Sequence, residues 1–239
     1  MAKVIDYLYV ILPFEKPFFE KKHQIPVDFV GHPLLDEISQ FDAGSEEAFR
    51  TEHKLANNKP IIALLPGSRT QEVKKMLHVM VEVCHKFPNY CFVVAAAPHL
   101  DNTLFEQLPV HVVREQTYSL LAHAKAALVT SGTATLETAL FNVPQIVCYK
   151  TSALSYAIGK QVVKLPFISL VNLILDEEVV PERVQSQCNT RQLTQDLEAI
   201  IDGPKRKAQL NAYKKLKTEL GDCGASNAVA SLITKRTGA

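Results

Sequence analysis

The chain has 239 residues, enough for one large domain or for one domain and part of another. An apolar content of 47% and a formal net charge of +1 are typical of a globular protein with a buried core, and they exclude a nucleic-acid binder held mainly by charge. No apolar run approaches the ~18 residues of a membrane span, and the five cysteines show no CxxC spacing, so we expect a soluble cytoplasmic protein with reduced thiols and no metal site.

The first forty residues do not resemble the start of a fold. Residues 7–12 and 27–30 read as short strands, with three phenylalanines between them. Two strands cannot make a stable sheet alone, so we expect them to join something else. His32 precedes a proline and is therefore held extended, either lining a cleft or filling a turn.

From Lys59 onward, apolar strands alternate with amphipathic helices. This alternation predicts an α/β fold, a Rossmann-like parallel sheet flanked by helices with right-handed crossovers. Ligands of such sheets bind beyond the carboxyl ends of the strands. The expected strands are residues 61–65, 91–97, 110–113, 126–129 and 145–149, and the expected helices between them are 71–87, 102–107, 117–124 and 134–141.

The remainder of the chain is expected to be helical. An apolar connector over residues 167–175 separates the first of these helices from the others. We expect helices at residues 155–164, 191–201, 205–220 and 226–233.

The loop after the first buried strand of this alternation has the residues of an anion site. Ser68 can cap a helix, and Gln71, three residues later, can close a capping box. Gly67 permits close approach of the backbone, and Arg69 adds a fork of donors, so the loop suits a phosphate. An ordinary capped helix with a solvated arginine is the alternative.

A second loop, Ser131-Gly132-Thr133-Ala134-Thr135, places small residues and hydroxyls after another buried strand. Such a helix start can hold a second phosphate, and Glu137, about one turn into the helix, can accept hydrogen bonds from a ribose diol. The alternative is that Glu137 only complements the helix dipole, worth roughly 0.3–1 kcal/mol. Neither loop matches the P-loop or GxGxxG patterns, which disfavours ATP and dinucleotides.

Four motifs follow one another along the chain: GHPLLD at Gly31–Asp36, LLPGSR followed by Glu72, TSGTATLE at Thr130–Glu137, and SLVNLI with EEVVPE within Ser169–Glu182. In this order they resemble the lipid-A-disaccharide synthases, which are glycosyltransferases of the GT-B architecture. The resemblance implies transfer of 2,3-diacylglucosamine from its UDP derivative to 2,3-diacylglucosamine 1-phosphate, with release of UDP and no cofactor or metal. It also implies a peripheral contact with the inner membrane, and it leaves a homo-oligomer open.

The resemblance covers only the carboxy-terminal part of the family, the half of a GT-B fold that binds the nucleotide-sugar donor. It implies that residues 1–40 are the trailing strand and linker of a missing amino-terminal domain, that residues 41–220 form the donor domain, and that 221–239 add a C-terminal helix. The family's proposed catalytic Asp lies in the missing part, so no residue here inherits that role. The implied donor contacts are Gly67, Ser68, Arg69, Glu72, Ser131, Gly132, Thr133, Thr135, Glu137, Asn172 and Glu178, with His32 as a cleft candidate.

Two other functions remain open from the sequence. A UDP-N-acetylglucosamine 2-epimerase-like isomerase shares the two-domain architecture, although the PGSR and GTATLE motifs fit it less well. A nucleotide-sugar-binding module without catalysis is the other alternative. In every case we expect this chain alone to lack transferase activity.

Overall fold

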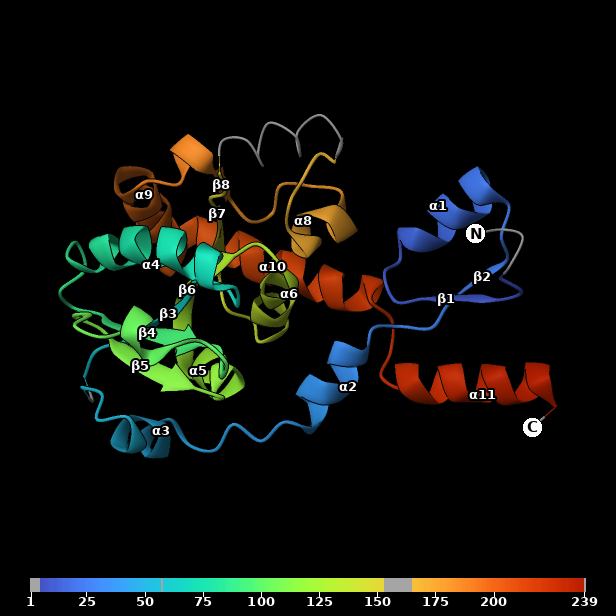
Figure 1. Ribbon diagram of the computed structural model, residues 1–239, viewed down its shortest axis with the longest axis horizontal. Helices are drawn as coiled ribbons and strands as arrows, with labels where there is room; N and C mark the ends of the chain where they lie inside the picture. The colour runs from blue at the N-terminus through green and yellow to red at the C-terminus, as the bar shows by residue number, and fades with distance from the viewer. Residues whose placement is uncertain (1–4, 57, 153–164, 239) are drawn as a thin grey trace. The chain divides into compact units, whose positions relative to one another are not determined.

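The computed structural model describes residues 5–56, 58–152 and 165–238 (Figure 1). The chain divides into two compact units: the larger comprises Asp42–Ala212, and the smaller combines Met1–Phe41 with Tyr213–Ala239. The helix expected at residues 155–164 lies outside the described residues.

The larger unit is built on a parallel sheet of six strands in the order β5-β4-β3-β6-β7-β8. β3 is central and pairs with β4 on one side and β6 on the other, with Leu65 opposite Val129 at the end of the β3–β6 pair. The sheet confirms the predicted α/β class. Its strands are β3 (Ile61–Leu65), β4 (Cys91–Ala96), β5 (His111–Arg114), β6 (Ala124–Thr130), β7 (Gln145–Tyr149) and β8 (Glu182–Val184).

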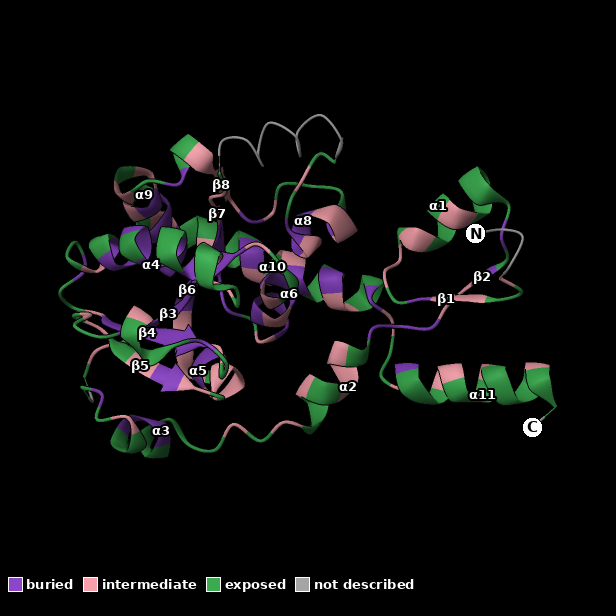
Figure 2. Cartoon of the chain, in the orientation of Figure 1, coloured by how far each residue is buried: buried purple, intermediate pink, exposed green. Residues whose placement is uncertain are grey.

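The sheet is buried on both faces, which explains why its strands read as continuous apolar runs. Ile62 and Leu64 point into a core shared with α4 and α9. Ile61 and Ala63 point into the opposite core, to which α3 and α5 contribute. Figure 2 shows the buried strands between partly exposed helices. The layered arrangement leaves the strand ends, rather than the faces, for ligands.

The helices of the larger unit follow the expected order, with local differences. The helix expected at residues 102–107 shortens to the 3₁₀ turn η1, and the apolar connector contains a helix of its own, α8, capped by the Ser169 side chain. None of the helices in the described part of the chain is long and apolar enough to cross a membrane. The bounds are α3 (Glu46–Glu52), α4 (Thr70–Cys84), η1 (Asn102–Leu104), α5 (Thr117–His123), α6 (Thr133–Leu140), α8 (Leu170–Leu175), η2 (Gln185–Gln187) and α9 (Thr190–Ile201). α10 (Gly203–Glu219) begins in the larger unit and ends in the smaller one.

The prediction that everything after residue 149 is helical was wrong at β8. This strand has three residues, all of them half-buried, and it lies at the edge of the sheet beside β7. A strand this short carries too little alternation for its pattern to be recognised in the sequence. The carboxylate of its first residue, Glu182, accepts hydrogen bonds from the backbone just before α8.

The smaller unit contains a two-stranded parallel sheet, β1 (Leu8–Val10) beside β2 (Val27–Phe29), with helices α1 (Glu15–His23), α2 (Pro33–Gln40) and α11 (Ala225–Thr237). The two strands expected to need a partner therefore pair with each other. Arg236 of α11 forms a 2.6 Å ion pair with Asp28 and donates a hydrogen bond to the Tyr9 hydroxyl at 3.2 Å. These contacts tie the end of the chain to its beginning within one unit.

Candidate functional site

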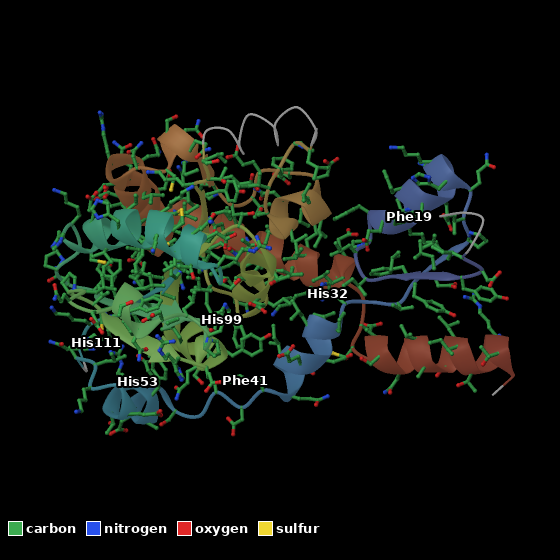
Figure 3. The ribbon with its side chains drawn as sticks, in the orientation of Figure 1. Phe19, His32, Phe41, His53, His99 and His111 are labelled. Carbon is green, nitrogen blue, oxygen red and sulfur yellow. The ribbon has the colours of Figure 1, made fainter. Side chains whose placement is uncertain are left out.

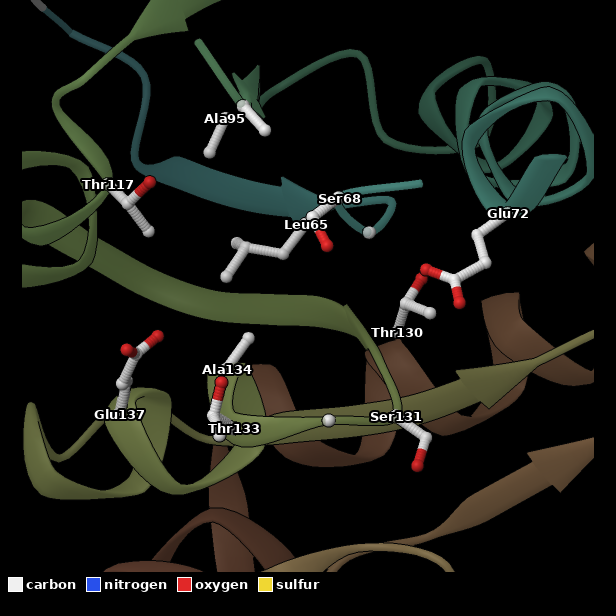
Figure 4. A pocket seen from close by; sticks show the side chains of 13 residues that line it. Leu65, Ser68, Glu72, Ala95, Thr117, Thr130, Ser131, Thr133, Ala134 and Glu137 are labelled. Carbon is white, nitrogen blue, oxygen red and sulfur yellow. The ribbon is translucent and has the colours of Figure 1, made fainter. Parts of the chain in front are cut away.

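A pocket lies at the carboxyl edge of the sheet, where the loops after β3 and β6 meet (Figure 4). Its volume is about 230 Å³. Because β3 and β6 are adjacent and parallel, the two loops that the sequence singled out emerge side by side. The pocket is lined by Leu65, Gly67, Ser68, Glu72, Ala95, Ala97, Thr117, Thr130, Ser131, Gly132, Thr133, Ala134 and Glu137.

The helix that follows β3 starts at Thr70, one residue before the expected bound, but its N-cap lies one residue later than predicted. Arg69, not Ser68, is the N-cap of α4, and no side chain caps the helix, so the expected capping box of Ser68 and Gln71 was wrong. Ser68 instead belongs to the preceding loop, where His99 Nε2 lies 2.8 Å from its carbonyl oxygen. The first N–H groups of α4 are thus left without a side-chain acceptor beside the pocket.

Both the backbone conformation at position 67 and the neighbouring side chains require a glycine there. Its φ of +109° is a conformation that residues with a side chain rarely adopt. A Cβ there would also lie 2.8 Å from Oε2 of Glu72 and 3.5 Å from Cγ2 of Thr130. Gly67 therefore allows Glu72 and Thr130 to approach the turn closely.

Arg69 lies outside the pocket lining. Its side chain is 83% exposed, and its Nη1 donates to Oε1 of Glu72 at 3.0 Å. Glu72 does line the pocket and is 24% exposed. The sequence predicted both residues as donor contacts, and the structure places only the carboxylate at the cavity.

The loop after β6 repeats the arrangement of the loop after β3. α6 begins at Thr133 with Gly132 as N-cap, again without a side-chain cap. The Ser131 hydroxyl donates to the Ile168 carbonyl at 2.7 Å, which ties this loop to the segment before α8. Thr135 is fully buried, and its hydroxyl donates to the Gly132 carbonyl at 2.8 Å, so it shapes the turn and does not line the pocket.

Glu137 lines the pocket from the second turn of α6 and is half-buried. Its Oε1 accepts a hydrogen bond of 3.4 Å from the Tyr118 hydroxyl. In Figure 4, Glu137 and Thr117 lie at one end of the pocket and Glu72 and Thr130 at the other. The two carboxylates are thus separated by the starts of the two helices.

Asn172 and Glu178 are not part of this pocket. Asn172 is fully buried, and its amide donates to the Val180 carbonyl and to Oε1 of Glu182, at 2.9 and 2.8 Å. Its Oδ1 accepts from the backbone N–H groups of Val179 and Val180, each at 2.9 Å. The side chain of Asn172 therefore holds the turn after α8 together, while Glu178 is exposed on that turn.

The residues predicted from the sequence do not include Thr117 and Thr130, two polar residues that line the pocket, or the supporting Glu182. Glu182 accepts hydrogen bonds from the backbone N–H groups of Ile168 and Ser169 at 2.8 and 3.0 Å. Thr130 ends a buried strand directly before the second loop, a position that would have identified it as a candidate. No group of three metal-ligating side chains occurs among the described residues.

His32, labelled in Figure 3, is the N-cap of α2 in the smaller unit. Its Nδ1 accepts a hydrogen bond from the Leu34 N–H at 3.2 Å, and the residue is 5% exposed. Burial lowers the pKa of His32, and the opposing charge of Glu15 offsets this only in part. The imidazole thus fills a structural position, and its cleft role stays a prediction.

Comparison with known proteins identifies one family over residues 1–235. The family model described as lipid-A-disaccharide synthetase matches residues 1–235. The lipid-A-disaccharide synthase of Syntrophus aciditrophicus (strain SB) is 39% identical over 242 residues, covering 96% of this chain and 62% of that protein. The chain therefore spans less than two thirds of the length of this curated relative.

Solved structures show the same fold at low identity. A UDP-GlcNAc 2-epimerase from Neisseria meningitidis, bound to UDP-GlcNAc, matches 98% of this chain and 62% of its own with a TM-score of 0.62 and 14% identity. WaaG, a glycosyltransferase involved in lipopolysaccharide biosynthesis, matches 88% of this chain and 58% of its own with a TM-score of 0.54 and 15% identity. These neighbours confirm the predicted Rossmann-like half of a GT-B fold.

The His32 cap predicts a pH-dependent stability. The unfolded imidazole binds protons near pH 6.5, whereas the folded one, with its pKa lowered, binds fewer at the same pH, so the free energy of unfolding falls as pH drops below about 6.5. His32→Asn keeps a capping acceptor that does not titrate, and it should reduce this acid-side loss of stability. Denaturant unfolding at pH 5 and pH 8 would measure it. Identical pH profiles for the two proteins would contradict the role of the cap.

Proposed function

Because this chain belongs to the lipid-A-disaccharide synthetase family, we propose that it is the donor-binding part of a glycosyltransferase that acts on UDP-2,3-diacylglucosamine. The acceptor is 2,3-diacylglucosamine 1-phosphate, and the products are the disaccharide and UDP. The observation that carries the proposal is the pair of helices, α4 and α6, that begin side by side at one pocket without side-chain caps.

Two uncapped helix starts suit a diphosphate. The first two N–H groups of each helix have no intrahelical acceptor, whereas the third bonds to the N-cap carbonyl, and the helix dipoles add partial positive charge at the same place. When UDP departs, negative charge develops on the diphosphate, and fixed N–H donors stabilise it without reorganisation. In this proposal the phosphates contact the backbone and hydroxyls of Gly67, Ser68, Ser131, Gly132 and Thr133.

In this proposal the nucleoside occupies the end of the pocket that Glu137 and Thr117 line. Glu137 already accepts a hydrogen bond from Tyr118, and a half-buried carboxylate can accept two more from a ribose diol. Thr117 lies at the same end of the pocket (Figure 4). No side chain that lines this pocket is assigned as the catalytic base.

The isomerase alternative has less support. The likeness to the epimerase structure is one of fold, at 14% identity, whereas the match to the synthetase family extends over residues 1–235.

The exposed apolar side chains of the smaller unit bear on two further inferences, peripheral membrane contact and self-association, both of which stay predictions. These side chains are Tyr7, Ile11, Phe14, Phe18 and Ile233.

The first expected outcome concerns Arg69. Among the described residues its exposed side chain contacts Glu72 alone, so it can turn toward a bound diphosphate, where a charged hydrogen bond contributes more than the surface ion pair it replaces. Calorimetric titration with UDP should show about tenfold weaker binding for Arg69→Ala. Lys75→Ala, which removes an exposed cation further along α4, is the matched control. Equal affinities for all three proteins would remove Arg69 from the site.

Glu137→Gln separates a ribose contact from a dipole effect. If the carboxylate binds the ribose diol, UDP affinity should fall about tenfold while the melting temperature stays within the range of ordinary surface variants. Glu198→Gln, an exposed glutamate on α9, controls for the loss of charge. Lost thermal stability with unchanged UDP affinity would instead assign Glu137 to the helix dipole.

The third expected outcome is that this chain alone forms no disaccharide. Nucleophile, base and leaving group must be held together, and such positioning can account for about 7–11 kcal/mol of barrier lowering. The assay uses both lipid substrates, with the chain alone and after mixing with a separately made amino-terminal part of a curated relative. Activity only after mixing supports the proposal. Turnover by the chain alone would contradict it and would direct the search for a base to His32 or Glu178.

A further inference from the structure

The end of the pocket remote from Glu137 holds a polar group that the fold does not satisfy. Thr130 lines the pocket and is 4% exposed, and its Oγ1 is buried without a hydrogen-bond partner among the described residues. Buried hydroxyls nearly always have a partner, because an unpaired one costs about 1–3 kcal/mol. A group supplied by a ligand explains why this one is retained.

A single rotamer step brings the Thr130 hydroxyl to the Gly67 turn. In the structure its methyl group, Cγ2, faces that turn, 3.5 Å from the position that a Cβ on Gly67 would occupy. Threonine χ1 has more than one common staggered well in strands, so a 120° step brings the hydroxyl to the place of the methyl group, and the methyl group moves to the place of the Cβ hydrogen. The hydroxyl then faces the same space as the carboxylate of Glu72.

Glu72 leaves one acceptor oxygen at this corner. Its Oε1 accepts from Arg69, while Oε2 lies 2.8 Å from the position of that same Gly67 Cβ. In Figure 4 the side chains of Glu72 and Thr130 point toward one another. An ionised carboxylate accepts hydrogen bonds and repels a phosphate, so the group recognised here must be a hydrogen-bond donor.

We propose that Glu72 and Thr130 form the subsite for the transferred sugar, where they bind one of its hydroxyl or amide N–H groups. This inference rests on the proposed nucleotide-sugar function. A nucleotide sugar has two donor-rich ends joined by a diphosphate, and the pocket has two carboxylates separated by two helix starts. With the ribose at Glu137, the sugar reaches the corner of Glu72 and Thr130.

The test compares UDP with UDP-N-acetylglucosamine, a donor analogue that adds a sugar with hydroxyl and amide groups. Calorimetric titrations are made with the whole chain, Thr130→Val and Thr130→Ser. Thr130→Val should bind UDP-N-acetylglucosamine about five- to tenfold more weakly, with UDP affinity changed less than about twofold. Thr130→Ser keeps the hydroxyl and should retain both affinities.

Thermal melts provide a second readout. Thr130→Val replaces an unpartnered buried hydroxyl with a methyl group, so its melting temperature should equal or exceed that of the unmodified chain. A lower melting temperature would show that the hydroxyl has a structural partner and would overturn the subsite. Glu72→Gln, which keeps the shape but weakens the acceptor, should lower sugar affinity in the same direction as Thr130→Val.

The outcomes separate this inference from the function on which it rests. If the unmodified chain binds UDP but Thr130→Val weakens both ligands equally, the corner contacts the nucleotide, and the sugar subsite alone is overturned. If Thr130→Val changes neither affinity, the subsite is likewise overturned. If the unmodified chain binds neither ligand, the proposed nucleotide-sugar function fails as well.

Discussion

The pairing of β3 with β6 is the constraint on which the site depends. The two strands are separated by almost sixty residues of sequence, yet their parallel register sets Leu65 opposite Val129, so both end at the same edge of the sheet. Each is followed at once by a short loop and a helix. Two helix starts therefore meet at one pocket, and their N–H groups converge as a consequence of sheet topology.

Charge is distributed unevenly around the proposed diphosphate site. The middle, where the helices begin, attracts anions through the backbone, whereas the charged side chains that line the cavity are the carboxylates of Glu72 and Glu137. The side chains of Arg69 and Glu72 neutralise one another at the rim. Backbone donors in the middle and acceptors at the ends match a ligand with a central anion and polar, hydroxylated ends.

A buried polar network supports this edge of the sheet. Asn172 and Glu182 together bind the backbone on both sides of α8, and Ser131 of the pocket loop binds the carbonyl of Ile168 in the same segment. Such a network is stable only when each member is satisfied, as Asn172 is. Asn172, which the motif predicted as a ligand contact, therefore has a structural role: it holds the backbone beside the pocket loop in place.

The amino-acid sequence by itself determined the alternation of strands and helices, the two loops and the family, because continuous apolar runs, helical periodicity and ordered motifs are local properties. The sequence did not predict β8, because three half-buried residues are too few to show the two-residue period of a strand. Tertiary structure alone decided the start of α4, the outward position of Arg69, the burial of Asn172 and the unpartnered hydroxyl of Thr130. Each of these depends on which residues distant in sequence come within contact, such as the approach of Thr130 and Glu72 to Gly67. Local patterns cannot encode that proximity, because it arises only when the sheet has formed.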